Sequence, residues 1–390
     1  MTPDFQNTEI AFQSMDDREL YRAFMLFSSM RWPLLVKFGT RAVQVAFSMK
    51  LPVKKIIRAT LFSHFCGGET IAGTLEKRNK LGSYGIGAVL DYSVEGKEEE
   101  KDFNATCKEI LRTIRASEGQ PLPFAVFKVT GIARFSLLEK VTKAQALTGS
   151  EEREWERVRA RVRSLCQDAV DSDVNLLIDA EETWVQGAVD QLAEEMMQVF
   201  NKKKGRIFHT LQMYRHDRLP YFEKLLECCK KDQWFLAVKV VRGAYMEKER
   251  EKADTEGQES PIYPDKEATD QAYDRALELC LGNKDRVTLF AGTHNEASCM
   301  KLVRLLQHRG QEDAEVIFSQ LLGMSDHLSF NLASCGYKVS KYVPYGPVQE
   351  ALPYLFRRAE ENTSIKGQAG RELSLISHEI RRRRESCKKS

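Results

Sequence analysis

Eight short, apolar and β-rich runs recur along this chain, and each is followed by a segment long enough to form a helix. They occupy residues 83–92, 124–130, 174–180, 206–214, 235–243, 287–294, 314–322 and 338–346. Strands that alternate with helix-length segments are expected to pair in parallel, because a tight turn cannot reach a parallel neighbour. Eight such units predict an α/β fold, a distorted (βα)8 barrel, and residues 83–370 slightly exceed the roughly 250 residues typical of that fold.

An open doubly wound sheet is the competing architecture, and it normally carries a glycine-rich phosphate loop after its first strand. The nearest match is Gly85-Ile86-Gly87, but it lies inside the first run, and Leu90 stands where the third glycine belongs. Residues 151–170 and 184–200 carry apolar side chains at three- and four-residue spacing, which predicts helices. The barrel is therefore favoured.

Composition limits the classes of function. The net charge of +3 is too small to indicate nucleic-acid binding, and nine cysteines without a C-x-x-C pair favour neither zinc nor disulfides, so we expect a reducing compartment. Four early acidic residues argue against a signal or transit peptide, namely Asp4, Glu9, Asp16 and Asp17. No apolar run approaches the roughly eighteen residues of a membrane-spanning helix.

Two flanking regions are expected around the barrel at residues 81–370. Residues 1–80 are predicted to form an N-terminal helical arm, whose apolar stretch 20–65 packs on the main domain or, as an alternative, lies on a membrane surface. Residues 371–390 pass from helical to a basic tail with six basic side chains after residue 380. We expect this tail to be solvated and disordered, with contact to anionic lipid as the alternative. The Gly-, Ser- and Pro-rich stretch 255–264 is either a lid or a surface loop.

Polar residues gather near the C-terminal ends of the predicted strands, where barrel enzymes place their chemistry. They are Asp91, Glu95, Lys128, Asp179, Glu181, Glu182, Gln212, Tyr214, Lys239, Arg242, Thr293, His294, Asn295, Gln320 and Tyr342. The acidic run 179–182 with His294 resembles a metal site, but the other strands offer lysine, glutamine and arginine. This mixture favours an anionic organic cofactor and no metal, while a Schiff-base aldolase using Lys128 or Lys239 stays open.

The C-terminal end of the predicted barrel carries a possible carboxylate site. The run 341–346 ends in a Pro/Gly turn and leads into a helix with the paired arginines Arg357 and Arg358. A guanidinium fork matches a carboxylate bidentately, and Glu361 lies one helical turn beyond Arg357, where it can orient the arginine. A solvated charged helix face is the alternative interpretation.

Several motifs together resemble those of the proline dehydrogenases, specifically the single-function type related to the eukaryotic mitochondrial enzymes. The motifs are GIGAVLDYSVEG, IDAEET, VKVVRGAY, THN, KYVPYG and RRAEEN, and the resemblance extends from about residue 65 to 367. It implies a distorted (βα)8 barrel with a C-terminal substrate-binding helix and noncovalent FAD without a Rossmann fold. It further implies oxidation of L-proline to Δ1-pyrroline-5-carboxylate by hydride transfer from C5 to flavin N5, with electrons passed to ubiquinone.

The resemblance also assigns the site residues. Arg357, Arg358 and Lys128 would bind the substrate carboxylate, and Glu361 would orient the arginines. Tyr342 would cover the proline ring, with Leu322 and Tyr354 also at the substrate, and Asp179 would pair with Lys128 beneath it. The residues expected at FAD are Asp179, Gln212, Lys239, Val241, Arg242, Ala244, Thr269, Thr293, His294, Asn295 and Gln320.

Three departures and alternatives follow from the resemblance. Lys239 is arginine and Arg242 is lysine in some bacterial members, so the positive charge at the flavin is retained. Relatives specialised for hydroxyproline carry a smaller residue at the Tyr342 position, so we expect a preference for proline, with a trans-4-hydroxy-L-proline dehydrogenase as the alternative. A non-enzymatic scaffold would require loss of the site residues, and none is lost.

The resemblance also sets expectations for partners and location. A separate pyrroline-5-carboxylate dehydrogenase is expected to oxidise the product, because no NAD fingerprint accompanies the barrel. Peripheral membrane contact would follow from the quinone acceptor. The location would be the cytoplasm or the inner face of the membrane in a bacterium, and the mitochondrial inner membrane for a processed eukaryotic protein.

Overall fold

A computed structural model describes residues 1–32, 36, 38–43, 49, 52–92, 98–308, 310, 314–364 and 368–389. The side chains of residues 360–364, 368, 369 and 389 are outside the described part. Glu95 was expected near a strand end, and the Glu361 side chain was expected beside the arginines. Both lie outside the described residues.

Eight strands form one closed parallel barrel in chain order. The strands are β1 Ile86–Tyr92, β2 Phe124–Lys128, β3 Asn175–Asp179, β4 Ile207–Gln212, β5 Leu236–Val241, β6 Val287–Gly292, β7 Val316–Leu321 and β8 Val339–Tyr345. Each lies within one of the eight predicted runs and is a few residues shorter. The predicted (βα)8 barrel is confirmed, and the open doubly wound sheet is excluded.

Helices follow the strands as the alternating pattern predicts. They are α6 Leu75–Gly82 before β1, then α7 Glu100–Ser117, α8 Phe135–Thr142, α9 Gly149–Asp171, α10 Thr183–Phe200, α11 Arg218–Lys231, α12 Met246–Glu256, α13 Lys266–Gly282, α14 Glu296–His308, α15 Asp326–Ser334 and α16 Leu352–Ser364. The helices expected at 151–170 and 184–200 are confirmed as α9 and α10. Thr148 and Glu151 start α9 with a reciprocal capping box, in which each side chain accepts a backbone N–H of the other residue.

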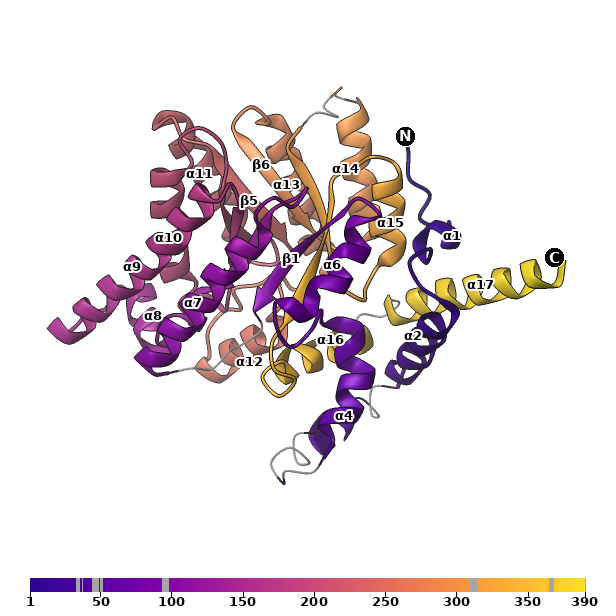
Figure 1. Ribbon diagram of the computed structural model, residues 1–390. Helices are drawn as coiled ribbons and strands as arrows, with labels where there is room; N and C mark the ends of the chain where they lie inside the picture. The colour runs from indigo at the N-terminus through magenta and orange to yellow at the C-terminus, as the bar shows by residue number, and fades with distance from the viewer. Residues whose placement is uncertain are drawn as a thin grey trace. The chain divides into compact units, whose positions relative to one another are not determined.

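The chain divides into two compact units, residues 1–94 with 320–390 as unit 1, and residues 95–319 as unit 2. In unit 2 the Phe124 ring packs between two other aromatic rings of the parallel strands. Its centroid lies 5.5 Å from that of Phe208 and 5.2 Å from that of Phe290. Figure 1 shows α10 beside α8 and α9 around these strands. The domain boundaries expected at residues 80 and 370 stay a prediction.

Loop 257–265, between α12 and α13, is held along the end of β4 in unit 2. Gly257 ends α12 in the left-handed conformation with φ +63°, which glycine adopts without strain. The Tyr263 N–H donates to the Tyr214 carbonyl at 2.7 Å, and the His216 N–H donates to the Pro261 carbonyl at 3.1 Å. Backbone hydrogen bonds therefore hold much of the stretch 255–264, for which the sequence predicted either a lid or a surface loop.

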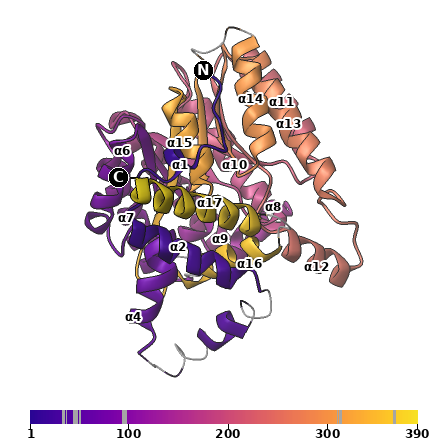
Figure 2. The same ribbon diagram turned by 90° about the vertical axis from the view of Figure 1, so that its right-hand side faces the viewer.

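Unit 1 joins both ends of the chain. Its strands β1 and β8 pair in parallel, with Ile86 opposite Val339. The helices α1 Thr8–Ala11, α2 Asp17–Met30 and α17 Gln368–Lys389 pack together, and Figure 2 shows α17 alongside α2. Their apolar faces, with α4 Lys54–Ile57 and α16, enclose one core.

The prediction of a disordered basic tail is wrong, because residues 381–389 continue α17. Arg383 donates to Glu379 at 2.8 Å, to Asp17 at 2.9 Å and to the carbonyls of Met15 and Phe12 at 3.0 Å each. These contacts fasten the helix to the N-terminal segment. A run of four arginines has the composition of a solvated tail, but here acidic partners on α17 and α2 satisfy part of its charge.

Candidate active site

A buried ion pair joins the ends of β3 and β5. Asp179 Oδ1 accepts a hydrogen bond from Lys239 Nζ at 2.6 Å and one from the Thr210 hydroxyl at 3.4 Å. The Lys239 residue is only 7% exposed, so its ammonium needs this carboxylate nearby. Lys128 on β2 lies opposite Asp179 in the register of the two strands, a position that would allow an ion pair between their side chains. Their pairing beneath the substrate stays a prediction.

Glu181 lies just past β3 and is fully enclosed. Its carboxylate accepts the Thr130 N–H at 3.1 Å and the Thr130 hydroxyl. Burial raises the pKa of Glu181 to about 7, against the opposing influence of Lys128 and the two Thr130 hydrogen bonds. The sequence placed this residue at a strand end but gave it no role, because spacing alone does not show burial.

The backbone of Glu181 positions a predicted cofactor residue. Its N–H donates to Gln186 Oε1 at 2.7 Å, and its carbonyl accepts the Gln212 Nε2 amide at 2.7 Å. Gln186 in turn donates to Asp190 at 2.7 Å, which also bonds His209 at 3.0 Å. The Gln212 amide at the end of β4 is thereby fixed in one orientation by a fully buried chain of hydrogen bonds.

Arg242 at the end of β5 is held from three sides. Its guanidinium donates to Asp270 on α13 at 2.6 Å, to the Thr293 hydroxyl at 2.7 Å and to the Ser298 hydroxyl on α14 at 2.9 Å. It also lies 4.3 Å from the centroid of the Tyr273 ring. Three N–H donors and the flat face of the guanidinium thus hold Arg242 in one position. Asp270, Ser298 and Tyr273 were not predicted, because they lie on helices rather than on strand ends.

The end of β6 brings together the predicted THN residues. The Asn295 side chain accepts the Ser298 N–H at 3.1 Å at the start of α14, and the Asn295 N–H donates to the Thr293 hydroxyl at 3.1 Å. Gly292 precedes them, and a Cβ there would lie 3.0 Å from Val241 and 3.9 Å from the Lys239 side chain. The backbone of β6 therefore approaches the β5 side chains closely.

The remaining predicted cofactor residues have different surroundings. Val241 and His294 are half-buried, and Ala244 is exposed. Thr269 is buried on α13, where its hydroxyl donates to the Asp265 carbonyl at 3.2 Å. In unit 1, Gln320 at the end of β7 is buried and accepts the Ser329 hydroxyl at 2.8 Å.

Two predicted substrate residues are linked by the backbone in unit 1. The Leu322 N–H, just past β7, donates to the Tyr342 carbonyl of β8 at 2.9 Å. Tyr342 is 6% exposed, so its ring is almost fully covered. Both positions expected to form the substrate wall therefore belong to one rigid corner of the barrel.

The turn after β7 is fixed by buried charges. Lys341 Nζ donates to Asp326 and to the Met324 carbonyl, both at 2.6 Å. Ser325 has φ +52°, a strained value for a residue with a side chain, and its N–H donates to Glu372 of α17 at 2.5 Å. This network was not predicted, and it ties the turn next to Leu322 to both β8 and α17.

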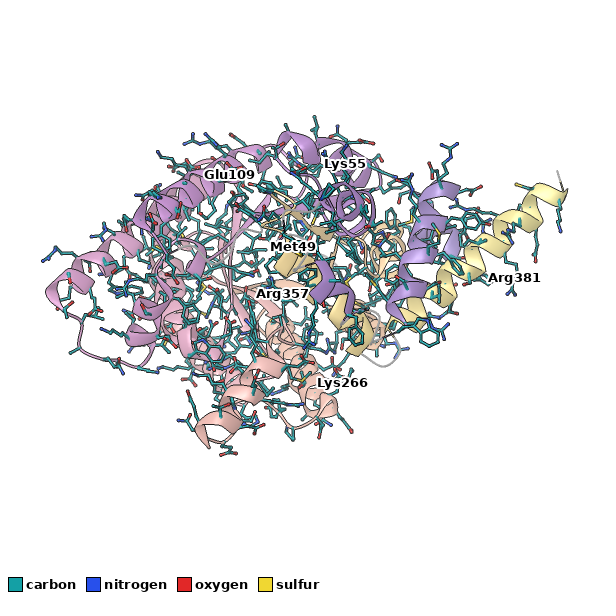
Figure 3. All side chains as sticks on the ribbon, turned by 90° about the horizontal axis from the view of Figure 1, so that it is seen from below. Met49, Lys55, Glu109, Lys266, Arg357 and Arg381 are labelled. Atoms are coloured by element: carbon teal, nitrogen blue, oxygen red, sulfur yellow. The ribbon has the colours of Figure 1, made fainter. Side chains whose placement is uncertain are left out.

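The arginines of the predicted carboxylate site lie on α16 as expected. Arg358 is buried, with its guanidinium 5.2 Å from the centroid of the Tyr354 ring. Arg357 is half-buried, and Figure 3 labels it on the same helix. Leu355, Phe356 and Ala359 pack the other side of α16 into the unit 1 core, which fixes the direction of both arginines.

The donor set of unit 2 fits an anionic heterocyclic cofactor. At the strand ends lie an ammonium, a guanidinium, an amide and hydroxyl groups, each held in place by the contacts above. Among the described residues no three His, Cys, Asp or Glu side chains gather as metal ligands. Cations and amides suit phosphates and ring heteroatoms.

The closed barrel, with cationic and amide side chains held at its strand ends, defines the class of (βα)8-barrel enzymes. Residues 74–371 match the sequence model of the proline dehydrogenase family, and the chain belongs to this family of enzymes. The family expected from the motifs is confirmed, and this sets aside the aldolase and the non-enzymatic scaffold.

Individual relatives agree with this family. The chain is 34% identical over 322 residues to the carbapenem antibiotics biosynthesis protein CarD of Pectobacterium carotovorum subsp. carotovorum, covering 82% of this chain and 84% of the relative. It is 31% identical over 377 residues to the mitochondrial proline dehydrogenase 2 of Arabidopsis thaliana, covering 85% and 79%. The human mitochondrial proline dehydrogenase 1 is 39% identical over 241 residues, which cover 60% of this chain and 40% of the human protein.

Solved structures share the fold. Proline utilization A from Bdellovibrio bacteriovorus, inactivated by N-propargylglycine, superposes with a TM-score of 0.71 at 18% identity over 93% of this chain. The alignment covers 36% of that protein, so this chain spans about a third of its length. At this identity the likeness shows the (βα)8 fold alone.

Proposed function

We propose that the protein oxidises L-proline to Δ1-pyrroline-5-carboxylate with noncovalently bound FAD and passes the electrons to a quinone. The observation that carries the proposal is the fixed donor set of Lys239, Arg242 and Gln212 in a chain of the proline dehydrogenase family. When bound, FAD accepts the hydride that leaves substrate C5.

The strand-end residues of unit 2 would hold this cofactor. Lys239 and Arg242 supply positive charge, and Gln212 and Asn295 supply amides, while Thr293 supplies a hydroxyl. Asp179 and Asp270 already pair with the two cations. The side chains of Lys239 and Arg242 therefore need little reorganisation when an anion binds. Preorganisation of this kind lowers the entropy cost of binding.

The α16 arginines would bind the substrate carboxylate. Arg358 is oriented by stacking near the Tyr354 ring, and Arg357 on the same helix is half-buried. Tyr342 on β8 would limit the space at substrate C4, which favours proline over 4-hydroxyproline.

The remaining steps concern partners. A separate dehydrogenase would oxidise the released product, and a lipid-soluble quinone would place the enzyme at a bacterial or mitochondrial membrane surface. Within the described residues, no helix combines the length and the apolar character needed to cross a bilayer. The membrane contact that we propose is a peripheral one.

The visible spectrum of the purified protein under anaerobic conditions tests the proposal. A flavin band that bleaches with L-proline, and weakly with trans-4-hydroxy-L-proline in a separate sample, supports the cofactor, the reaction and the role of Tyr342. Stronger bleaching with hydroxyproline would reverse the substrate assignment. A colourless protein that binds no added FAD would overturn the proposal, and borohydride trapping on Lys128 or Lys239 would then indicate Schiff-base chemistry.

A further inference from the structure

The N-terminal part of unit 1 contains a long segment without acidic residues. Between Glu19 and Glu69, residues 20–68 include no Asp or Glu, and this segment is called the basic arm below. It contains eight basic residues, namely Arg22, Arg31, Lys37, Arg41, Lys50, Lys54, Lys55 and Arg58. The basic arm thus carries a formal charge of +8 in a chain whose net charge is +3.

The same segment exposes large apolar side chains. Among the described residues eleven large hydrophobic side chains are exposed, and six of them lie in the basic arm. They are Tyr21, Met25, Trp32, Phe38, Met49 and Ile56, of which Trp32 reaches 71%. Single exposed apolar residues are ordinary, but a concentration of them in one segment marks an interaction surface.

Charged and apolar side chains alternate closely on the described parts of the arm. Arg22 and Met25 lie about one turn apart on the exposed face of α2, whose opposite face packs Leu20, Ala23 and Phe27 into the core. Lys55 and Ile56 are exposed neighbours on α4, and Figure 3 labels Lys55 there. This arrangement puts cations beside apolar groups at several points.

Few of these cations have internal partners. Within the described part of the chain, the arm's ion pairs are those of Lys54 and Arg58 with Glu69, at 3.0 and 3.3 Å. Arg31, Arg41 and Lys55 are exposed without such a pair there. The C-terminal tail differs, because Arg382 and Arg383 both bond Glu379 on their own helix.

We propose that the described, exposed residues of the basic arm, on α2 and α4 and at positions 31, 32, 38 and 41, form the surface by which this protein docks on an anionic lipid bilayer. Trp32, Phe38 and Ile56 would enter the boundary between headgroups and acyl chains, and the adjacent cations would contact lipid phosphates. Tryptophan favours this boundary because its ring is amphipathic. The inference deepens the proposed function, since it places the enzyme where its proposed quinone acceptor dissolves.

Charge complementarity selects this occupant over a second copy of the chain. Two basic arms brought face to face would juxtapose like charges with no acidic residue in either arm to compensate them. An anionic bilayer supplies the missing negative charge and also covers the exposed apolar side chains. Nucleic acid supplies the charge but offers no apolar layer to cover Met25, Met49 and Ile56.

Co-sedimentation of the full-length holoprotein with vesicles tests the inference. Vesicles of phosphatidylcholine alone are compared with vesicles that also contain phosphatidylglycerol. We expect binding to the anionic vesicles, and we expect it to fall by roughly tenfold or more in W32S/F38S and in R31E/R41E. The matched controls are F135S, an exposed apolar residue of α8, and R381E, an exposed cation of α17, which should bind as the wild type does.

Three outcomes would overturn the inference. These are equal binding by arm variants and controls, loss of binding in R381E alone, and a concentration-dependent dimer that disappears in W32S/F38S. Reduction of a soluble dye by proline is measured in parallel and should be unchanged in every variant. Wild-type protein that binds vesicles but does not oxidise proline would contradict the proposed function and leave the docking surface standing.

Discussion

Single buried charges determine much of the chemistry available at the strand ends. Lys239 and Arg242 each have an acidic partner within hydrogen-bonding distance, whereas Glu181 is held by the neutral Thr130 and lies near Lys128. An enclosed carboxyl group without a direct cationic hydrogen-bond donor retains its proton to higher pH. Glu181 is thus the strand-end acid whose charge changes near neutrality.

Glu181 should make stability depend on pH in a defined direction. Its pKa is raised from 4.5 in the unfolded chain to about 7 in the fold. Between these values the folded protein holds the proton more tightly, so this residue's contribution to stability falls as pH rises, by up to about 3 kcal/mol. Glu181→Gln cannot ionise, so its unfolding free energy should rise relative to that of the wild type as pH increases from 4.5 to 7. Above pH 7 the difference between the two proteins should stay constant.

Urea unfolding at intervals from pH 4.5 to 8 measures this difference. Glu152→Gln on the exposed face of α9 serves as the control for removing a surface carboxyl group. A difference between Glu181→Gln and wild type that is the same at all these pH values would show that Glu181 does not titrate in this range.

Arg357 should contribute strongly to substrate binding. A hydrogen-bonded, largely desolvated charge contact is worth about 2–5 kcal/mol, so Arg357→Met should lower kcat/KM for proline roughly 30- to 5,000-fold, mainly through KM. Steady-state kinetics with a soluble dye measures this change. Arg381→Met on α17, which removes an exposed arginine, should leave both constants unchanged. A KM shift below about threefold would place Arg357 outside the substrate site.

Tyr342 should control discrimination at substrate C4. Tyr342→Ser opens space for a hydroxyl group and should raise the ratio of hydroxyproline to proline efficiency, by roughly 10- to 100-fold if the exclusion is steric. Tyr342→Phe keeps the bulk of the ring and should keep the wild-type ratio. The role assigned to Tyr342 fails if the serine variant also leaves the ratio unchanged.

At the scale of elements, α17 connects the two ends of the chain in unit 1. Glu379 is completely buried and accepts the Thr8 hydroxyl at 3.0 Å and Arg382 and Arg383 at 2.8 Å each. Burial alone would raise the pKa of Glu379, but these hydrogen bonds lower it below its ordinary value. The carboxylate is therefore ionised in the fold and binds α17 to α1.

Removing this carboxylate should loosen the junction. Glu379→Ala removes one acceptor each from Thr8, Arg382 and Arg383 and should cost about 1–3 kcal/mol of unfolding free energy. Urea denaturation at neutral pH measures the loss. Glu385→Ala, an exposed residue of the same helix, should have almost no effect. Equal transition midpoints for the two variants would mean that Glu379 does not hold α17 in place.

The strands were predictable, and the continuation of α17 through residues 381–389 was not, for physical reasons. A barrel strand is buried on both faces, so it appears as a nearly continuous apolar run such as Leu236–Val241, in which Lys239 is the one charged residue. The polar residues beyond each run indicated the strand ends of the site, but not their pairing, because Lys239 and Asp179 lie 60 residues apart. Arg383 and Asp17 are 366 residues apart, and no local pattern reveals such a contact.

At the scale of the whole molecule, charge is distributed unevenly. The basic arm carries a formal charge of +8, whereas the whole chain carries +3, so the residues outside the arm sum to −5. An anionic surface therefore attracts this segment more strongly than the remaining residues, whose summed charge is negative, and this difference would orient the protein as it approaches. Screening limits this effect to about 8 Å at physiological salt, so orientation would be set close to the surface.

Cofactor loading should stabilise the whole protein if FAD binds as proposed. A ligand that binds only the folded state adds about 2.7 kcal/mol at one hundred times its Kd, which should raise the Tm of deflavinated protein by roughly 3 °C for a chain of this length. Thermal unfolding with increasing FAD measures the shift. Lys239→Met removes the buried ammonium and weakens cofactor binding, so its FAD-induced shift should shrink, whatever its own starting Tm. Lys108→Met, exposed on α7, should keep the full shift. A wild-type Tm unchanged by FAD contradicts the cofactor assignment, whereas equal shifts in Lys239→Met and wild type contradict only the role of Lys239.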